Sequence, residues 1–220
     1  MEQNDVNYVE VIGKILKIYM AKPGRCLITV RCGHNTPEFF CVDDNAEYVK
    51  GLKNGDNVMI VANIQSSYKP KLNRNVSTYF VNRIIKLPDK SYSECYRNEF
   101  YIRGKIKAVY LLDKSRIARI FIETNVNGHK SVFPISYYDY EESVTEAMQP
   151  GTKLDCCGMI QAMKKTIDNI TVYYQNPVIK MPTHKIKTAL YIAIIRLILI
   201  STIEVSDENP YYVSVDNILY

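Results

Sequence analysis

Lysine and arginine side chains interspersed with aromatic rings are the residues of this chain whose types and spacing suggest chemistry. From Val11 to Pro37 the sequence has five basic residues and no acidic one, and from Arg103 to Arg119 it has six basic residues against one aspartate. There are 18 tyrosines and no tryptophan. A single nucleic-acid strand presents phosphates and exposed bases, which are held by cations and by flat aromatic faces. The pattern therefore predicts a surface that binds single-stranded nucleic acid.

The candidate contacts are cations for phosphates and rings for bases. Each stacked base contributes ~1–3 kcal/mol whatever its identity, so stacking predicts sequence-tolerant binding. Tyr68 is the best single candidate ring, because its polar and basic surroundings offer it no core to join. In the second half, Tyr110, Tyr137 and Tyr173 are further candidates. The predicted nucleic-acid-binding residues are Lys14, Lys17, Tyr19, Arg25, Arg31, Phe39, Phe40, Tyr68, Lys69, Lys71, Arg74, Arg103, Lys105, Lys107, Arg116, Phe133, Lys164 and Lys165.

No residue pattern in the sequence indicates an enzyme. His34, His129 and His184 are scattered, and no nucleophile elbow, phosphate-binding loop or zinc-binding helix motif occurs. The adjacent carboxylates at 43–44 and 141–142 open predicted helices, where acidic residues interact favourably with the helix dipole. We therefore predict a non-catalytic protein that needs no cofactor.

Cysteine usage and the start of the chain bear on the compartment. Residues 1–5 are polar and acidic, unlike a secretory signal, so we expect reduced thiols in a cytoplasmic protein. Several cysteines fall in strand patterns, where a free thiol behaves as a small hydrophobe. The alternative is a zinc site around Cys32 and His34, although paired ligand spacings are absent. The six cysteines are Cys26, Cys32, Cys41, Cys95, Cys156 and Cys157.

The elements that must position these residues occur twice. Residues 11–15 (Val-Ile-Gly-Lys-Ile) recur, 91 positions later, as residues 102–106 (Ile-Arg-Gly-Lys-Ile). Such a spacing suits a small domain rather than a solenoid repeat. Gly13 and Gly104 stand in mid-strand, where glycine marks a bulge or a tight bend. Two further blocks match in the same order, 52–56 with 148–152 and 82–88 with 176–182.

Each copy reads as three strands, a helix and two strands. This is the order of the OB-fold, a five-stranded Greek-key barrel with a helix between strands three and four. We therefore predict a mainly β protein of two tandem OB-folds, with a polar loop at 66–75. In the first copy the predicted strands are 8–19, 26–32, 38–42, 57–65 and 76–85, with the helix at 43–52. In the second they are 99–111, 117–124, 130–136, 153–163 and 169–179, with the helix at 140–148.

Residues 183–220 match neither copy. The apolar run from Ala189 to Ile200 is 12 residues long and contains Arg196, which is too short to span a membrane as a helix of about 20 apolar residues. We expect this segment to be buried in the fold or in a subunit interface. The predicted boundaries are 1–88 for the first OB-fold, 89–97 for a linker, 98–182 for the second, and 183–220 for the apolar segment and acidic tail.

The first copy resembles the bacterial and phage single-stranded-DNA-binding proteins. The matching features are residues 11–15, the aromatic pair Phe39 and Phe40, the turn at 52–58, and the pair Tyr68 and Lys69. The resemblance implies that Phe39 or Phe40, together with Tyr68, stacks bases. It also implies a homo-oligomer, although two barrels in one chain could pair within it, and a tail (216–220) that recruits replication or recombination proteins. The residue usage suggests a phage, plasmid or low-GC bacterial source.

Together these patterns predict sequence-tolerant binding of single-stranded DNA without catalysis, in replication, recombination or DNA transfer. Two alternatives remain open at this point. One is an OB-fold subunit that binds protein partners in a replication or conjugation assembly, and the other is an RNA-binding protein. Weaker aromatic candidates in the second copy favour a structural role for that copy.

Overall fold

Strands dominate the part of the chain that the computed structural model describes, which comprises residues 4–69, 74–88, 96–140, 146, 148–167, 170–179, 214–215 and 218–219. Residues 1–181 belong to one compact unit and 182–220 to a second. The elements of the first unit are β1 (Val6–Lys22), β2 (Arg25–Arg31), β3 (Glu38–Val42), α1 (Asp43–Lys50), β4 (Asn57–Lys69), β5 (Arg74–Leu87), β6 (Arg97–Leu112), the 3-10 turn η2 (Asp113–Ser115), β7 (Ile117–Val126), β8 (His129–Tyr138), β9 (Lys153–Ile167) and β10 (Ile170–Ile179).

The first five strands close on themselves through their pairings, and we call them the first ring. β1 pairs antiparallel with β2, β2 with β3, and β4 with both β5 and β1, while β3 and β5 run parallel. Alternate residues point inward, so Cys26, Ile28 and Val30 of β2 are buried and the residues between them are not. α1 follows β3 and has Asp43 and Asp44 in its first turn.

The second ring, β6 to β10, repeats these pairings. β6 pairs antiparallel with β7, β7 with β8, and β9 with both β10 and β6, while β8 and β10 run parallel. The turn before the fourth strand makes the same bond in both rings. Gly55 N donates to Ile15 O, and Gly151 N donates to Ile106 O, both at 2.8 Å. The helix predicted at 140–148 falls almost wholly outside the described residues.

Two strand ends differ from the sequence-based expectation. The polar stretch 66–75 was predicted to be a loop, but β4 continues to Lys69 and β5 starts at Arg74, so most of it belongs to a hairpin. The second ring has an equivalent hairpin of β9 and β10. Polar composition misled the prediction, because antiparallel pairing satisfies the backbone of a hairpin without the need for apolar side chains.

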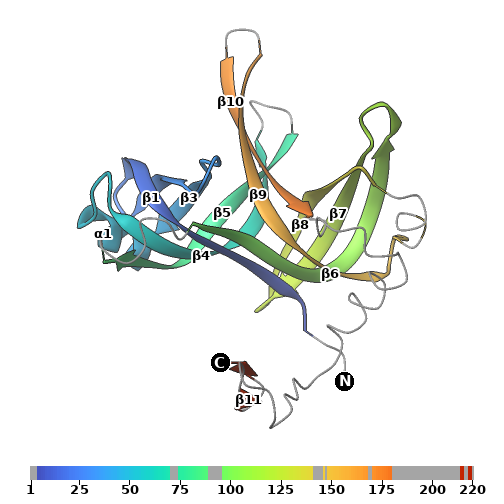
Figure 1. Cartoon of the computed structure of the whole chain (residues 1–220), viewed down its shortest axis with the longest axis horizontal. Helices are drawn as coiled ribbons and strands as arrows, with labels where there is room; N and C mark the ends of the chain where they lie inside the picture. The colour runs from blue at the N-terminus through green and yellow to red at the C-terminus, as the bar shows by residue number, and fades with distance from the viewer. Residues whose placement is uncertain are drawn as a thin grey trace. The chain divides into compact units, whose positions relative to one another are not determined.

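One antiparallel seam joins the two rings. Residues 6–12 of β1 pair with residues 97–103 of β6, which makes a continuous sheet of ten strands. Figure 1 shows β1 and β6 running side by side, with α1 and β3 at one end of the unit and β7 and β8 at the other. The buried apolar side chains of both rings form one cluster. The two rings therefore pair with each other within the chain.

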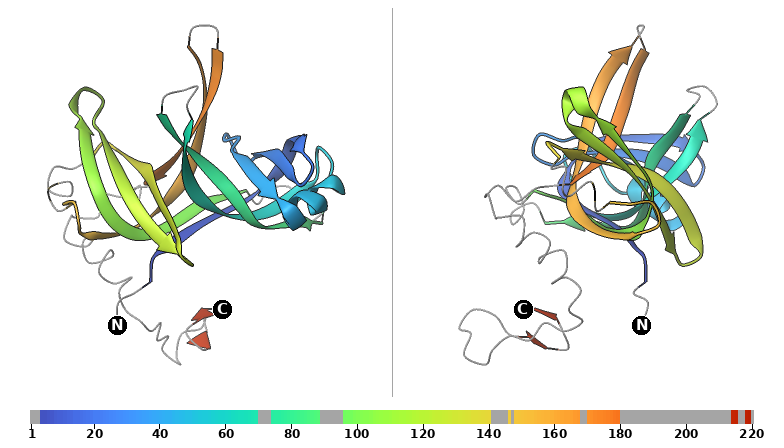
Figure 2. Two further views of the ribbon diagram at one scale, coloured as in Figure 1. Left: turned by 180° about the vertical axis from the view of Figure 1, so that it is seen from behind. Right: turned by 90° about the vertical axis from the view of Figure 1, so that its right-hand side faces the viewer.

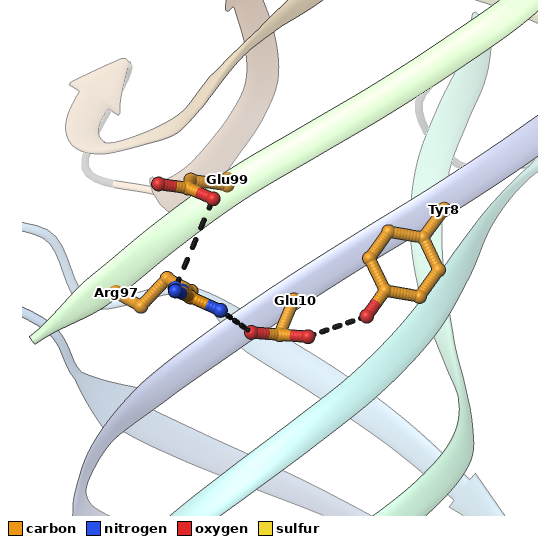
Figure 3. A network of polar contacts seen from close by, with 4 residues as sticks. All are labelled: Tyr8, Glu10, Arg97 and Glu99. Atoms are coloured by element: carbon orange, nitrogen blue, oxygen red, sulfur yellow. Dashed lines mark hydrogen bonds and ion pairs between the residues drawn. The ribbon is translucent and has the colours of Figure 1, made fainter. Parts of the chain in front are cut away.

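Charged groups on the outer side of this seam are paired. Arg97 Nη1 of β6 donates to Glu10 Oε1 of β1 at 2.5 Å, and its Nε lies 3.8 Å from Glu99 (Figure 3). The Tyr8 hydroxyl donates to the other oxygen of Glu10. Burial raises the pKa of Glu10, but the bonds from Tyr8 and Arg97 outweigh it and lower that pKa. Burial, followed by the bond to Glu10, raises the pKa of Tyr8 to about 12.

An asparagine side chain is hydrogen-bonded to the main chain of the fourth strand in each ring, and we call each such pair of bonds an amide clamp. Asn7 Nδ2 donates to Ile64 O at 2.7 Å, and its Oδ1 accepts from Ile64 N at 2.8 Å. Asn98 makes the same two bonds with Ile160, at 2.8 and 2.9 Å. Asn7 also donates to Thr124 Oγ1 of the second ring at 3.3 Å. The side-chain amide thus replaces a neighbouring peptide group.

Replacing either asparagine by alanine is expected to destabilise the protein. The change leaves the N–H and C=O of a buried isoleucine without partners, which costs roughly 1–3 kcal/mol for each unsatisfied group. Denaturant unfolding of Asn7→Ala and Asn98→Ala measures the loss. Asn54→Ala, at an exposed turn position, serves as the control and should unfold as the unsubstituted protein does. Equal midpoints for all three variants would mean that the clamps contribute nothing.

The second unit has two short strands among its described residues, β11 (Ser214–Val215) and β12 (Ile218–Leu219), which pair antiparallel. The apolar run at 189–200 lies outside the described residues. No helix in the described part of the chain has the length and apolar character needed to cross a membrane.

Candidate nucleic-acid interface

A row of apolar side chains crosses the outer surface of the first ring. Tyr19 of β1 lies opposite Leu27 of β2, which lies opposite Phe40 of β3. Phe40 in turn pairs with Phe80 of β5, and their rings meet edge to face with centroids 5.2 Å apart. Directly paired residues share a face of the sheet, and the burial pattern of β2 and β3 puts this face away from the core. We call these four residues the apolar row.

The apolar row is accessible to a ligand. Tyr19 is 56% exposed, and the other three side chains are partly exposed. Large apolar groups at a protein surface, set side by side, are typical of binding sites. Phe40 and Phe80 are uncharged rings, and Tyr19 adds a third, so the row offers flat faces on which bases can stack.

Cations surround the row on the same strands. Lys17 precedes Tyr19 by two residues on β1, and Arg25 and Arg31 stand at the two ends of β2. All three are exposed, as is Lys22, while Lys14 is partly exposed. Within the described residues, none of these five cations forms an ion pair. These cations are the candidates on β1 and β2 for contact with an anionic ligand.

The second ring has a smaller version of the same surface. Tyr110, the counterpart of Tyr19, is 59% exposed, and its ring meets Phe121 edge to face with centroids 5.6 Å apart. Arg119 lies opposite Tyr110 and is exposed. Arg116, also exposed, donates to Tyr140 O at 2.9 Å, and its guanidinium carbon lies 5.7 Å from the centre of the Tyr140 ring.

Several cations of the second ring are neutralised by the protein itself. Arg103 Nε lies 2.7 Å from Asp155 Oδ1, and its side chain is 14% exposed. The bond to Asp155 is the main reason that the pKa of Arg103 is raised. Lys107 lies 3.5 Å from Glu123, which also pairs with Lys130 at 2.9 Å. Lys105 is exposed. Arg103, predicted to contact phosphate, is thus held in an ion pair at the seam, and we remove it from the candidate set.

The aromatic candidates Phe39 and Phe133 are wrong. Both are fully buried, and Tyr137 is 1% exposed. The alternation within β3 turns Phe39 inward, where its ring packs edge to face on Tyr79, and turns Phe40 outward. Phe133 is likewise an inward-facing residue of β8. A base has no access to these rings, and Phe40 is the member of the aromatic pair that faces solvent.

The predicted hairpin contacts fall outside what the structure describes of the side chains. Lys71 lies outside the described residues altogether. For the others, only the strand that holds the backbone is known. These are Tyr68 and Lys69 in β4, Arg74 in β5, Lys164 and Lys165 in β9, and Tyr173 in β10.

The cysteines of the described residues are free thiols. Cys26, Cys32, Cys41 and Cys156 are buried, as predicted, and Cys157 is exposed. Burial raises the pKa of each buried thiol, which keeps it protonated at neutral pH. No group of three or more His, Cys, Asp or Glu side chains in the described part of the chain is arranged to hold a metal ion.

No protein-family model and no curated protein matches the chain. Solved structures, in contrast, include proteins with a similar fold. The single-stranded DNA binding protein from Thermus aquaticus matches with a TM-score of 0.54 and 9% identity, over 84% of this chain and 97% of that one. A deletion mutant of that protein matches with a TM-score of 0.57 and 9% identity, over 84% of this chain and 98% of that chain. A match of this extent includes both rings.

The chain has the fold of a bacterial single-stranded DNA binding protein. This agrees with the resemblance inferred from the first copy, and it extends that resemblance over the second ring, where the sequence signal is weaker. In OB-folds generally, oligonucleotides bind to the face of strands two and three and to the loops after strands one and four. The apolar row lies on that face in the first ring.

Sequence reasoning missed three residues of this surface. Leu27 and Phe121 are outward-facing positions of second strands, and Phe80 is the outward neighbour of the buried Tyr79. A signal for Leu27 and Phe121 was present, because each alternates with small or branched apolar residues that are buried. Phe80 lies between the buried Tyr79 and Val81, and three consecutive apolar residues do not show in the sequence which of them faces outward.

Proposed function

We propose that this chain binds single-stranded DNA without base-sequence preference and without catalysis, as two tandem OB-folds. The observation that carries the proposal is the apolar row, which lies among five cations that have no ion-pair partner in the described residues. The fold shared with the Thermus aquaticus single-stranded DNA binding protein supports it. Bases stack on Tyr19 and Phe40, with Phe80 supporting Phe40 from the side.

Phosphates are neutralised by the cations of the same two strands. Lys17, Arg25 and Arg31 are exposed at intervals along β1 and β2, so that a strand crossing the row passes them in turn. The second ring binds more weakly in this proposal, because Tyr110, Phe121 and Arg119 remain available there whereas Lys107 is paired with Glu123. The proposed site residues are Lys14, Lys17, Tyr19, Arg25, Arg31, Phe40, Lys105 and Arg116, with Tyr68, Lys69, Lys71, Arg74, Lys164 and Lys165 on the hairpins.

The proposed domain boundaries are those expected from the sequence. Residues 1–88 and 98–182 are the two OB-folds, 89–97 is a linker, and 183–220 holds the apolar segment and the acidic tail. We propose a cytoplasmic protein of a phage, plasmid or bacterium, acting in replication, recombination or DNA transfer. The protein is a homo-oligomer in this proposal, with the apolar segment buried in the fold or in a subunit interface, and the tail binds proteins of the same process.

Titration of a labelled dT oligonucleotide, followed by fluorescence anisotropy at several salt concentrations, tests the function. We expect tight binding that duplex DNA of equal length fails to compete. Single-strand binding weakens with salt by about 0.7 in the log–log slope per neutralised phosphate, so three or four contacts predict a slope of about −2 to −3. Competition by RNA of equal length would assign the protein to RNA. Absence of binding at low salt would contradict the proposal and favour a protein-interaction subunit.

A further inference from the structure

The hairpin of β9 and β10 belongs to the second ring, but it is fastened to the first. Glu38 N donates to Gln175 Oε1 at 2.6 Å, and Gln175 Nε2 donates to Glu38 O at 3.1 Å. Ala162 N donates to Asn35 Oδ1 at 3.3 Å. Glu38 opens β3, and Asn35 lies in the connection between β2 and β3. Both contacts are therefore made with the segment that leads into the base-binding face of the first ring.

The two contacts fall on a single rung of the hairpin. Gln175 of β10 is the direct cross-strand partner of Ala162 of β9. One rung is thus held from both strands, by the side chain of Gln175 on one and by the main-chain N–H of Ala162 on the other. The hairpin is therefore tied to the first ring through both of its strands.

Gln175 fills the open edge of β3 at its first residue. The parallel pairing of β3 with β5 covers Phe39 and Phe40, whereas Glu38 pairs with Thr29 of β2. Gln175 supplies both a donor and an acceptor to the main chain of Glu38, as a peptide group of a neighbouring strand does. Asn7 and Asn98 use the same geometry on the fourth strands.

The fastened rung lies beside the apolar row. Glu38 and Phe40 are two residues apart on β3, about 7 Å along the strand, and point to the same face. Beyond the rung the hairpin continues through residues 163–167 and 170–174, five on each strand, for about 17 Å. This extension carries Lys164, Lys165, Tyr173 and Tyr174 in its sequence. Figures 1 and 2 show that it rises from the same side of the unit as the hairpin of β4 and β5.

We propose that the β9–β10 hairpin is a side wall of the base-binding face of the first ring, with Gln175 as its positioning residue. The inference rests on the proposed function and adds that the first ring's site is completed by the second. A DNA strand lying on Phe40 then contacts both rings. The second ring thus takes part in binding through its hairpin, in addition to its own surface, on which some of the cations are paired.

Gln175→Ala in the full chain tests the inference with a dT oligonucleotide of about 16 nucleotides. Loss of the two bonds is expected to weaken binding about three- to tenfold. The salt slope is also expected to become less negative by about one, because a displaced hairpin brings fewer of its cations to the phosphates. In a Lys164→Ala/Lys165→Ala background, Gln175→Ala should add little further loss.

Asn98→Ala is the matched control, because it removes an amide clamp of the same kind that lies wholly within the second ring. Its affinity and salt slope should equal those of the unsubstituted protein. Equal affinity for Gln175→Ala and the unsubstituted protein would overturn the inference and leave the proposed function intact. Equal losses in Gln175→Ala and Asn98→Ala would also overturn it, as a general loosening of the fold. Absence of DNA binding by the unsubstituted protein would overturn both proposals.

Discussion

Replacing Phe40 by alanine is expected to lower the affinity for a dT oligonucleotide by about 5- to 150-fold, whereas replacing its neighbour Phe39 is expected to lower stability instead. One stacked base is worth ~1–3 kcal/mol, and Phe40 is the phenylalanine of the pair whose ring faces solvent on the apolar row. Phe39 is fully buried against Tyr79. Truncating a buried phenylalanine costs about 3–5 kcal/mol, because the cavity left behind only partly collapses.

The two neighbouring variants control for each other. Thermal unfolding of Phe39→Ala should show a midpoint about 6–20 °C lower, whereas that of Phe40→Ala should change by a few degrees. Anisotropy titrations well below both midpoints should show near-normal affinity for folded Phe39→Ala. If Phe39→Ala and Phe40→Ala lose affinity equally while both are folded, the apolar row is not where bases stack. Tyr48→Ala, an exposed aromatic on α1 away from the row, should bind normally.

The contrast between Phe39 and Phe40 also shows which features of the strands the sequence could predict and which it could not. Period-two alternation requires one of two neighbours to point inward, and it placed β2 and β3 within a residue of their observed limits. It does not say which neighbour points inward. The register with β2 decides which of the two points inward, because Phe39 lies opposite the buried Ile28 and Phe40 lies opposite Leu27.

Other parts of the site depended on contacts between segments far apart in the chain. Arg103 belongs to a basic run, and its partner Asp155 lies 52 residues away on β9. The sequence alone therefore predicted that Arg103 contacts a phosphate. The fastening of Gln175 to Glu38 spans 137 residues. Basic residues without such partners, above all those of β1 and β2, were predicted correctly as exposed cations, because no acidic residue lies near them in the sequence and none pairs with them among the described residues.

The repeated glycines were predicted to mark a bulge or bend, and the structure gives a more specific reason for them. At Gly13 and Lys14, β1 pairs with β4 on one side, and on the other side its pairing with β2 begins at Lys14. A Cβ atom on Gly13 would lie 2.7 Å from Cγ1 of Val30 and in hard contact with the carbonyl oxygen of Arg31. The bulge itself comes three residues later, and β6 has its equivalent after Ile106.

Alanine at Gly13 or Gly104 is therefore expected to destabilise the protein strongly, by an amount comparable to truncation of the buried Phe39. At Gly104 the added Cβ would lie in hard contact with the carbonyl oxygen of Glu123 and 2.9 Å from Cγ2 of Thr124. The obstacle in each ring is main chain, so the first and second strands must move apart at the point where the ring closes. Overpacking with room to adjust costs about 1–3 kcal/mol, and we expect about 3 kcal/mol or more here, with valine preventing stable folding.

Gly51→Ala separates this close approach from the general effect of replacing a glycine. Gly51 has a helical φ of −81°, and an added Cβ would meet its nearest neighbour, Tyr48 O, at an ordinary 3.5 Å. Its thermal midpoint should stay within a few degrees of the unsubstituted protein, while those of Gly13→Ala and Gly104→Ala fall by about 6–12 °C or more. The two glycines close different rings that share one core, so a single transition shifted as a whole by either exchange would mean that the rings unfold together. A midpoint near normal for both would show that the first and second strands do not approach as closely as the pairing of Lys14 with Arg31 requires.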